Sequence, residues 1–271
     1  MNTSLPNARP APDDVLRSGL SVFFPAYNDQ PTIAGLVRAA HETLAPLTAE
    51  FEVIVVNDGS RDGTLEALAP LQEEMGGRLR VVTHEVNRGY GAALRSGFAA
   101  ARYPWVFYTD GDGQYDVREL AGLLSHAGET IGLVNGYKRQ RQDPAHRIWI
   151  GKFYNAVVRR VFGIRLRDID CDFRLIRRHI VTPDRLRADG GTICIEIAML
   201  AEASGLGTVV VPVGHYPRLH GRSQFFRIRP LLNTFRELLK LHATRVSLPL
   251  LARLATPLPA LFKPSRAAEG D

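Results

Sequence analysis

The chain of 271 residues has only two cysteines, Cys171 and Cys194, and no long hydrophobic run. Two cysteines form neither a disulfide framework nor a zinc-binding pattern, which fits a reducing cytoplasm. No run approaches the ~18–20 apolar residues that a helix needs to span a bilayer. Residues 1–14 are polar and proline-rich, without the apolar core of a signal peptide. We therefore expect a cytoplasmic protein, either soluble or peripheral on the inner face of the membrane.

Lysine is absent from the first half of the chain, where acidic residues dominate. Residues 1–137 carry 10 arginines and 17 acids, whereas residues 138–271 carry 24 lysines or arginines and 11 acids. Such asymmetry indicates an anionic partner for the second half, namely nucleic acid, an anionic membrane surface or a phosphorylated substrate. The alternative is a solvated arginine-rich surface, which the scarcity of lysine supports.

Two common nucleotide-binding motifs are also missing. The segment Gly89-Tyr-Gly91 lacks the third glycine of a GxGxxG dinucleotide fingerprint, and no GxxxxGK[ST] loop occurs. These absences count against NAD-dependent and ATP-hydrolysing enzymes. The chain also has no recognisable nucleic-acid-binding module with interleaved aromatic residues, so we expect no nucleic-acid partner.

Apolar runs of strand length alternate with segments of helical periodicity along most of the chain. The expected strands are 20–24, 51–56, 80–83, 105–108, 131–137 and 209–213. The expected helices are 33–44, 65–75, 91–101, 120–127, 151–162 and 192–203. This alternation is typical of an α/β fold with a doubly wound, mostly parallel sheet and right-handed crossovers.

The flanking segments differ in composition from this alternating core. We expect residues 1–18 to be a disordered tail, residues 19–224 to form one domain, and residues 225–271 to be an amphipathic helical extension. Residues 138–147 are polar and basic and are expected to form a mobile loop. The helix predicted from Phe225 to about Val246 either lies in a membrane interface or docks on the core, and the pattern favours neither.

The stretch Tyr108-Thr-Asp-Gly-Asp-Gly-Gln-Tyr115 ends the fourth predicted strand with two carboxylates. Alternation along a strand would place Asp110 and Asp112 on the same side, at the carboxyl edge where open α/β sheets bind ligands. One or two carboxylates suit Mg²⁺ or Mn²⁺ together with a diphosphate. An ordinary Asp-Gly turn is the alternative.

Two other predicted strands end in related chemistry. Pro25-Ala-Tyr-Asn28 follows the first strand, and Asn57-Asp58-Gly-Ser60 follows the second. Because the carboxyl ends of parallel strands meet at one edge of a sheet, these segments and Asp110–Asp112 are expected to lie together. Such an edge suits a nucleotide whose diphosphate is bridged by a metal ion.

The motifs in this order resemble family 2 glycosyltransferases of the GT-A fold. They are PAYND (25–29), VNDGS-RDGT (56–64), NRGYGAALRSGF (87–98) and TDGDGQY (109–115). Two later segments, DIDCDFRLIRR (168–178) and HYPRLHGRSQFF (215–226), are similar to the branch of polyprenyl-phosphate (dolichol-phosphate) mannosyl- and glucosyltransferases. The resemblance covers roughly residues 19–230 and implies a GT-A, Rossmann-like fold.

The resemblance also implies a nucleotide pocket and a metal site. The residues lining the nucleotide-base pocket would be Pro25, Ala26, Tyr27 and Asp29, where members of the family usually have glutamate at the last position. Asp58 would hydrogen-bond the base or ribose, although an acid in a turn before Ser60 is the alternative. Asp110 would face the ribose and the metal, while Asp112 and Gln114 would ligate Mg²⁺ or Mn²⁺.

Cationic side chains and one serine are implied around the donor and acceptor phosphates. The candidates are Arg88, Lys138, Arg139, Arg147, Arg218, Arg222 and Ser223, whereas Arg141 is expected to be solvated. Asp172 stands where the family has glycine, which leaves open how Asp170 and Asp172 point. Glu196 either holds an arginine or is a core carboxylate, and His215 is expected to be structural.

The activity implied is an inverting transfer of a hexose from a GDP- or UDP-sugar to a polyprenyl monophosphate. The metal would neutralise the leaving diphosphate and arginines would bring the two anions together. A hydroxyl acceptor would instead need a base, for which Asp168 is the candidate. The alternatives are a soluble family 2 enzyme acting on a saccharide, protein or small molecule, and a non-catalytic nucleotide-binding protein. The sequence decides neither the nucleotide sugar nor the oligomeric state.

Overall fold

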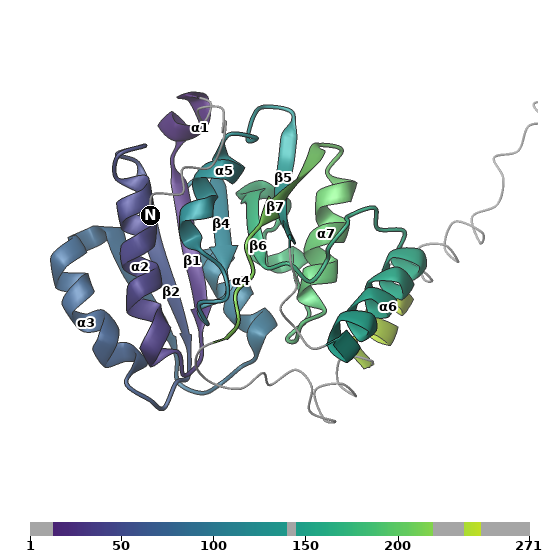
Figure 1. The fold of residues 1–271 in the computed structure, drawn as a ribbon, viewed down its shortest axis with the longest axis horizontal. Helices are drawn as coiled ribbons and strands as arrows, with labels where there is room; N and C mark the ends of the chain where they lie inside the picture. Colours follow the sequence, from purple (N-terminus) through teal and green to yellow (C-terminus); the bar gives the residue numbers. More distant parts are fainter. Residues whose placement is uncertain (1–12, 140–144, 219–235, 245–271) are drawn as a thin grey trace, which may run out of the picture.

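The protein is a seven-stranded sheet covered by helices on both faces (Figure 1). The structure is a computed structural model that describes residues 13–139, 145–218 and 236–244. The strands are β1 Leu20–Ala26, β2 Phe51–Asp58, β3 Leu79–His84, β4 Trp105–Thr109, β5 Ile131–Lys138, β6 Phe173–Arg177 and β7 Gly207–Val213. The helices are α1 Asp13–Ser18, α2 Gln30–Leu44, α3 Thr64–Met75, α4 Tyr90–Ala100, α5 Leu120–Leu124, α6 Ala145–Phe162 and α7 Ile193–Ala203.

The strand order is β3-β2-β1-β4-β6-β5-β7, and every neighbouring pair is parallel except the two that contain β6. The predicted α/β class with a mostly parallel, doubly wound sheet is therefore confirmed. The six expected strands are present with ends shifted by a few residues. Strand β6 was missed because its arginines, Arg174 and Arg177, interrupt the apolar pattern that marks a buried strand.

Alternate side chains of the central strands build two separate cores. Val22 and Phe24 of β1 pack in the cluster that includes residues of α2, α3 and α5. Phe23, between them, packs in the cluster that includes residues of α4, α6 and α7. Because strand side chains alternate between faces, a near-continuous apolar strand serves both layers. The all-buried β2 confirms the burial on both faces that its sequence predicts.

The start of the domain differs from the expected disordered tail. Asp13–Ser18 forms α1, and Val15 is buried against the core beside β1. Leu16 packs against the same cluster, and its carbonyl accepts from Thr48 Oγ1 at 2.7 Å, so both apolar contacts and a long-range hydrogen bond hold this segment. The earlier part of the expected tail, residues 1–12, lies outside the described residues.

The expected basic loop also proves shorter than predicted. Lys138 is the last residue of β5, and α6 begins at Ala145 rather than at Gly151. Of the predicted loop 138–147, residues 140–144, which include Arg141, lie outside the described part of the chain.

Residues 236–244 are helical and rest on the second core. Leu241 is buried and Leu238 packs against the same cluster, while the ring of His242 lies 5.9 Å from that of Phe162. This part of the C-terminal extension therefore docks on the core. The remainder of the predicted helix, 225–235 and 245–246, lies outside the described residues. Within the described ranges, no helix has the length and apolar character to cross a membrane.

Candidate active site

The turns that follow β1 and β2 interlock at the carboxyl edge of the sheet. Strand pairing brings Ala26 level with Asn57, so the two turns begin side by side. The backbone N–H of Asn28 donates to Ser60 Oγ at 3.0 Å, and the side chain of Asn28 accepts from the N–H of Arg61 at 2.8 Å. These contacts fix the two turns relative to each other and leave Tyr27 39% exposed at their surface.

Asp58, the last residue of β2, is a buried carboxylate held by three protein donors. Its Oδ1 accepts from His84 Nδ1 at 2.6 Å and from the N–H of Arg88 at 2.8 Å, and its Oδ2 accepts from the N–H of Gly89 at 3.0 Å. A carboxylate offers about four acceptor positions, so Oδ2 retains one. The backbone N–H of Ser60 donates to Asn57 Oδ1 and not to Asp58. This argues against the alternative that Asp58 is only an acid that caps the turn before Ser60.

Asp110 and Asp112 lie in a turn beyond the end of β4, which stops at Thr109. The expectation that strand alternation aligns the two acids is therefore wrong. The turn is instead fixed to the end of β1 and the start of α2, because the N–H of Gly111 donates to Pro25 O at 3.2 Å and Thr32 Oγ1 donates to Gly111 O at 2.6 Å. Contact with these two elements, rather than the pleat of β4, places the carboxylates.

Gly111 lets its turn approach the end of β1 and the cap of α2 closely, and Gly111→Ala is expected to push them apart. A Cβ at this position would stand 2.8 Å from Pro25 O and 3.1 Å from Asp29 Oδ2. Because these atoms belong to β1 and to the cap of α2, we expect a loss of about 1–3 kcal/mol in the free energy of unfolding. Urea denaturation measures it, with Gly122→Ala, which meets open space, as the control. Equal effects for the two variants would contradict the close approach.

Asp110 is part of a convergence of negative charge. Its Oδ1 accepts a 2.8 Å hydrogen bond from the hydroxyl of Tyr90 in α4. Burial, together with the charges of Asp172 and Asp112, raises the pKa of Asp110 well above its usual range. Asp172 immediately precedes β6 and accepts from the thiol of Cys194 at 3.0 Å. A third acid, from a strand the sequence did not predict, thus joins the expected pair.

The carboxylate of Asp112 is bound to the side chain of Arg218 in this structure. The guanidinium of Arg218 donates to Asp112 Oδ2, and the N–H of Gln114 donates to Asp112 Oδ1 at 2.9 Å. The side-chain amide of Gln114 donates to the carbonyl of Tyr216 at 3.2 Å. Arg218, which the resemblance assigns to phosphates, therefore reaches the site, and the role of Gln114 as a metal ligand stays a prediction.

The acid cluster fits a divalent cation in its chemistry. Within the described residues, no three His, Cys, Asp or Glu side chains are arranged to hold a metal ion by themselves. However, carboxylate oxygens are what Mg²⁺ and Mn²⁺ prefer, and these ions often take their remaining ligands from water and substrate phosphates. Burial is the main cause of the raised pKa of Asp110, and the charges of Asp172 and Asp112 add to it, so a divalent cation would offset the repulsion among these acids. Asp110 and Asp112 are the residues that would hold the ion, with Arg218 displaced from Asp112.

Asp29 closes the site on the side of α2 and carries a testable pH dependence. Its carboxylate accepts from the N–H of Tyr27 at 2.9 Å. Burial, reinforced by the charge of Asp112, raises the pKa of Asp29 from 3.8 to about 6. The folded state therefore holds this proton more tightly than the unfolded state, and the free energy of unfolding falls as the pH rises from about 4 to 6.

Asp29→Asn is expected to remove this contribution and to be more stable than wild type above pH 6. Asparagine keeps an acceptor for the Tyr27 amide, and at ~1.4 kcal/mol per pKa unit the gain is at most about 3 kcal/mol, less with partial solvent access. Urea unfolding in EDTA at pH 4.5 and 7.5 measures it, with exposed Asp184→Asn as control. A difference between Asp29→Asn and wild type that does not grow with pH would contradict the shift.

The remaining predicted site residues divide between the acid cluster and the strand ends around it. Lys138 lowers the pKa of Asp110 through its charge, and its Nζ donates to Asp170 O at 3.1 Å, so it lies at the cluster. The charge of Arg139 instead acts on Glu119. Asp168 is buried and accepts from the N–H of Lys138 at 3.3 Å.

Three other predicted cations have no described side-chain contact with the cluster. Arg88 is exposed, and its backbone N–H, rather than its guanidinium, makes the contact with Asp58. Arg147 lies in the early turns of α6, and its side chain is outside the described part of the structure, as are Arg222 and Ser223. Their roles stay predictions.

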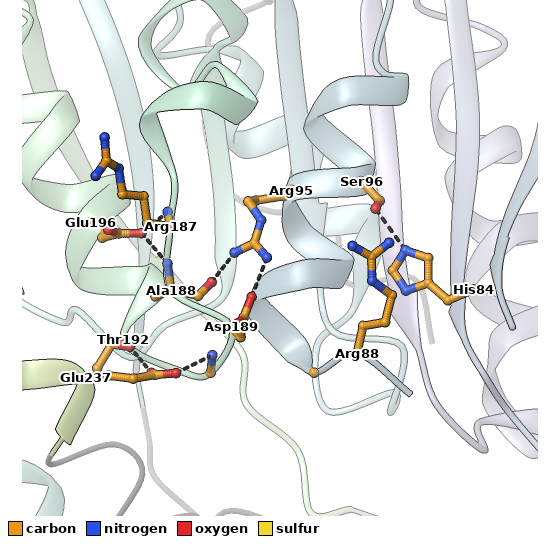
Figure 2. A network of polar contacts seen from close by, with 12 residues as sticks. His84, Arg88, Arg95, Ser96, Arg187, Ala188, Asp189, Thr192, Glu196 and Glu237 are labelled. Carbon is orange, nitrogen blue, oxygen red and sulfur yellow. Dashed lines mark hydrogen bonds and ion pairs between the residues drawn. The ribbon is translucent and has the colours of Figure 1, made fainter. Parts of the chain in front are cut away.

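Glu196 holds backbone rather than an arginine side chain. Its Oε2 accepts from the N–H groups of Arg187 and Ala188 at 2.8 and 2.9 Å (Figure 2). Of the two alternatives for Glu196, the structure therefore supports a core carboxylate, because two amides of the segment before α7 supply its donors. Glu196 is a satisfied buried carboxylate that shapes the segment.

His215 is buried and packs on the ring of Tyr115 at 5.3 Å, as expected of a structural residue.

Several polar residues of this region were not predicted from the sequence. Tyr90 and His84 lie within or beside the NRGYG motif, in which the glycines are the more prominent signal. Arg95 of α4 donates to Ala188 O and to the carboxylate of Asp189, and Glu237 accepts from Gly190 N and Thr192 Oγ1 (Figure 2). These contacts join segments 94 or 47 residues apart, so no local pattern could have revealed them.

The chain is similar in sequence to known proteins. Residues 21–182 match the family model described as glycosyl transferase family 2. An undecaprenyl-phosphate 4-deoxy-4-formamido-L-arabinose transferase of Pseudomonas aeruginosa (strain LESB58) is 32% identical over 225 residues, which cover 83% of this chain and 64% of that protein. A protein of the same name from Aeromonas hydrophila is 30% identical over 206 residues, covering 76% and 62%. The chain thus spans less than two thirds of the length of these relatives.

Solved structures share the fold. Glucosyl-3-phosphoglycerate synthase from Mycobacterium tuberculosis, in complex with phosphoglyceric acid, superposes with a TM-score of 0.60 at 22% identity and covers 87% of this chain and 80% of that chain. The same enzyme with Mn²⁺, uridine diphosphate and glucosyl-3-phosphoglycerate gives 0.58, with the same identity and coverage. The strand-end motifs, the sheet and the match over more than half of its length show that this chain belongs to glycosyl transferase family 2.

Proposed function

We propose that the protein is a metal-dependent, inverting glycosyltransferase that moves a sugar from a nucleoside diphosphate to a polyprenyl monophosphate. The observation that carries this proposal is the meeting of Asp110 and Asp112 with Asp172 at the sheet edge, beside the turns of Tyr27 and Asp58. Acidic oxygens and exposed backbone turns at the carboxyl ends of parallel strands suit a nucleotide diphosphate and its cation.

The names of the relatives support both substrates. The Pseudomonas and Aeromonas proteins are named for transfer to undecaprenyl phosphate, and the mycobacterial enzyme binds Mn²⁺ and uridine diphosphate. We extend these properties to this chain as a donor of the GDP- or UDP-sugar class, a cofactor of Mg²⁺ or Mn²⁺, and a lipid phosphate acceptor. Such an acceptor places the enzyme at a membrane surface.

Acidic and basic residues have different proposed roles in binding the donor. A divalent cation at Asp110 and Asp112 would supply Lewis-acid stabilisation to the leaving diphosphate. Tyr27 offers an exposed ring to the base, and Asp58 retains one acceptor position on Oδ2 for it. Lys138 and Arg218 lie at the acid cluster, where they can neutralise and orient phosphates.

A lipid phosphate acceptor removes the need for a strong base. Its second pKa is near ~6, so its oxygen is already anionic at neutral pH, and the protein has to position it rather than deprotonate it. Asp168 is buried and hydrogen-bonded to the amide of Lys138, so under this proposal it positions the end of β5. If the acceptor is a hydroxyl, Asp168 is the base.

The test uses the purified chain with Mn²⁺, a panel of labelled GDP- and UDP-sugars, and polyprenyl phosphate in detergent or vesicles. Label that enters the lipid phase, and fails to do so in EDTA, is the expected result. Hydrolysis of the donor without a lipid product points to a saccharide, protein or small-molecule hydroxyl as acceptor. Nucleotide binding without any turnover points to a non-catalytic binding protein, and absence of binding would sink the proposal.

A further inference from the structure

His84 ends β3 at the point where the sheet meets α4. Strand pairing sets it level with Asp58, and its side chain is buried. Its two ring nitrogens have separate partners. Nδ1 lies 2.6 Å from Asp58 Oδ1. Nε2 lies 2.8 Å from Ser96 Oγ (Figure 2). The imidazole therefore bridges the end of β2 to the middle of α4.

The partners define the direction of each hydrogen bond. An ionised carboxylate only accepts hydrogen bonds, so Nδ1 of His84 carries a hydrogen and donates a hydrogen bond to Asp58. In the neutral ring Nε2 then accepts from the hydroxyl of Ser96, which fixes the tautomer. The imidazole is held by its own contact with α4 while it holds the carboxylate.

Asp58 passes this constraint to the turn that opens α4. Its oxygens accept from the N–H groups of Arg88 and Gly89, and the next residue, Tyr90, donates its hydroxyl to Asp110. A continuous line of contacts thus runs from His84 through Asp58 and the 88–90 turn to the acid cluster. Rotation of the Asp58 carboxylate would release two amides and move Tyr90.

The other side of the same turn is fixed separately. The N–H of Gly91 donates to Asp189 O at 2.8 Å, and Arg95 donates to Ala188 O and to the Asp189 carboxylate (Figure 2). The segment before α7 therefore holds α4 from the far side, and His84 is the side chain that braces Asp58 from the β3 side.

We propose that His84 is a positioning residue for nucleotide binding: it orients Asp58, and through Asp58 the 88–90 turn, toward the donor. This inference rests on the proposed function, because the nucleotide is the ligand whose binding it tunes. His84 does not touch the donor in this arrangement; its effect is on how well the Asp58 acceptor and the turn are preorganised.

Two substitutions separate the hydrogen bond from the volume of the ring. His84→Asn keeps a donor near the position of Nδ1, whereas His84→Phe keeps the ring and removes both hydrogen bonds. We expect His84→Phe to raise the Kd for UDP or GDP in Mn²⁺ about tenfold, the size of one charge-assisted hydrogen bond. His84→Asn should stay close to wild type, and a donor KM raised with little change in kcat would accompany the effect in turnover.

Hydrogen exchange reports the same contacts without any ligand. The amides of Arg88 and Gly89 should lose protection in His84→Phe and keep it in His84→Asn, with exposed His126→Asn as the unaffected control. Loss of protection with unchanged nucleotide affinity would overturn the inference, as would equal affinities for the two variants. Failure of the wild type to bind either nucleotide, with the protection pattern as expected, would count against the proposed function and remove the nucleotide role with it.

Discussion

Replacement of Arg174 by leucine is expected to lower the free energy of unfolding by about 3–5 kcal/mol, because it removes one partner from a buried network of charged and polar groups. Arg174 is fully buried in β6, next to the acid cluster. Its guanidinium donates to Cys171 O at 3.1 Å, to the hydroxyl of Tyr108 at 3.0 Å and to Ile169 O.

The cost arises from the groups left behind. Leucine would strand these buried carbonyls without a donor, and each such loss costs about 1–3 kcal/mol. It would also remove the cation that lies 4.0 Å from Asp172, leaving a carboxylate with less compensation beside Asp110. Lysine keeps the charge but cannot reproduce the fork of donors, so Arg174→Lys should lose nearly as much stability.

Denaturation in guanidinium chloride measures these differences. The variants compared are Arg174→Leu, Arg174→Lys and the exposed control Arg118→Leu. Adding Asp172→Asn to Arg174→Leu should recover part of the loss, because the carboxylate that depended on the arginine is then neutral. A midpoint for Arg174→Leu that matches wild type would show that the buried guanidinium does not hold this region together.

Replacement of Asp112 by asparagine is expected to reduce sugar transfer at least about 10²-fold, the scale on which a lost charge-stabilising group lowers kcat. Asparagine keeps the size of the side chain and an acceptor for the N–H of Gln114 but loses the charge that binds Arg218 in this structure and that would bind the proposed divalent cation in its place. If the change acts through that cation, UDP or GDP affinity should fall in Mn²⁺ and stay unchanged in EDTA.

Asp116→Asn is the matched control for this variant. It makes the same change four residues later, and asparagine still caps the following turn, where Asp116 accepts from the N–H of Arg118. Isothermal titration with and without Mn²⁺, alongside the transfer assay, separates the two. Loss of nucleotide affinity in EDTA as well would show that Asp112 contacts the nucleotide or supports the turn, and would contradict a role confined to the metal.

The sequence by itself determined the fold class and the edge of the sheet at which the site forms. Apolar runs such as β2 require burial on both faces, and their alternation with helices leaves few architectures other than a parallel α/β sheet. Polar residues at the ends of these runs, namely Tyr27, Asp58 and Asp110, mark the carboxyl ends of the strands. The local sequence is enough to locate them because each apolar run ends at such a residue.

Only the tertiary structure decided how these groups face one another. Strand β6 and its buried Arg174 escaped prediction because a charged residue in a core is stabilised by carbonyls that come together only in the fold. The third acid of the site, Asp172, arrives with that strand, and the bracing of Asp58 by His84 crosses from β2 to β3. Hydrogen bonds between residues distant in sequence leave no periodic trace, since nothing in either segment alone records the partner.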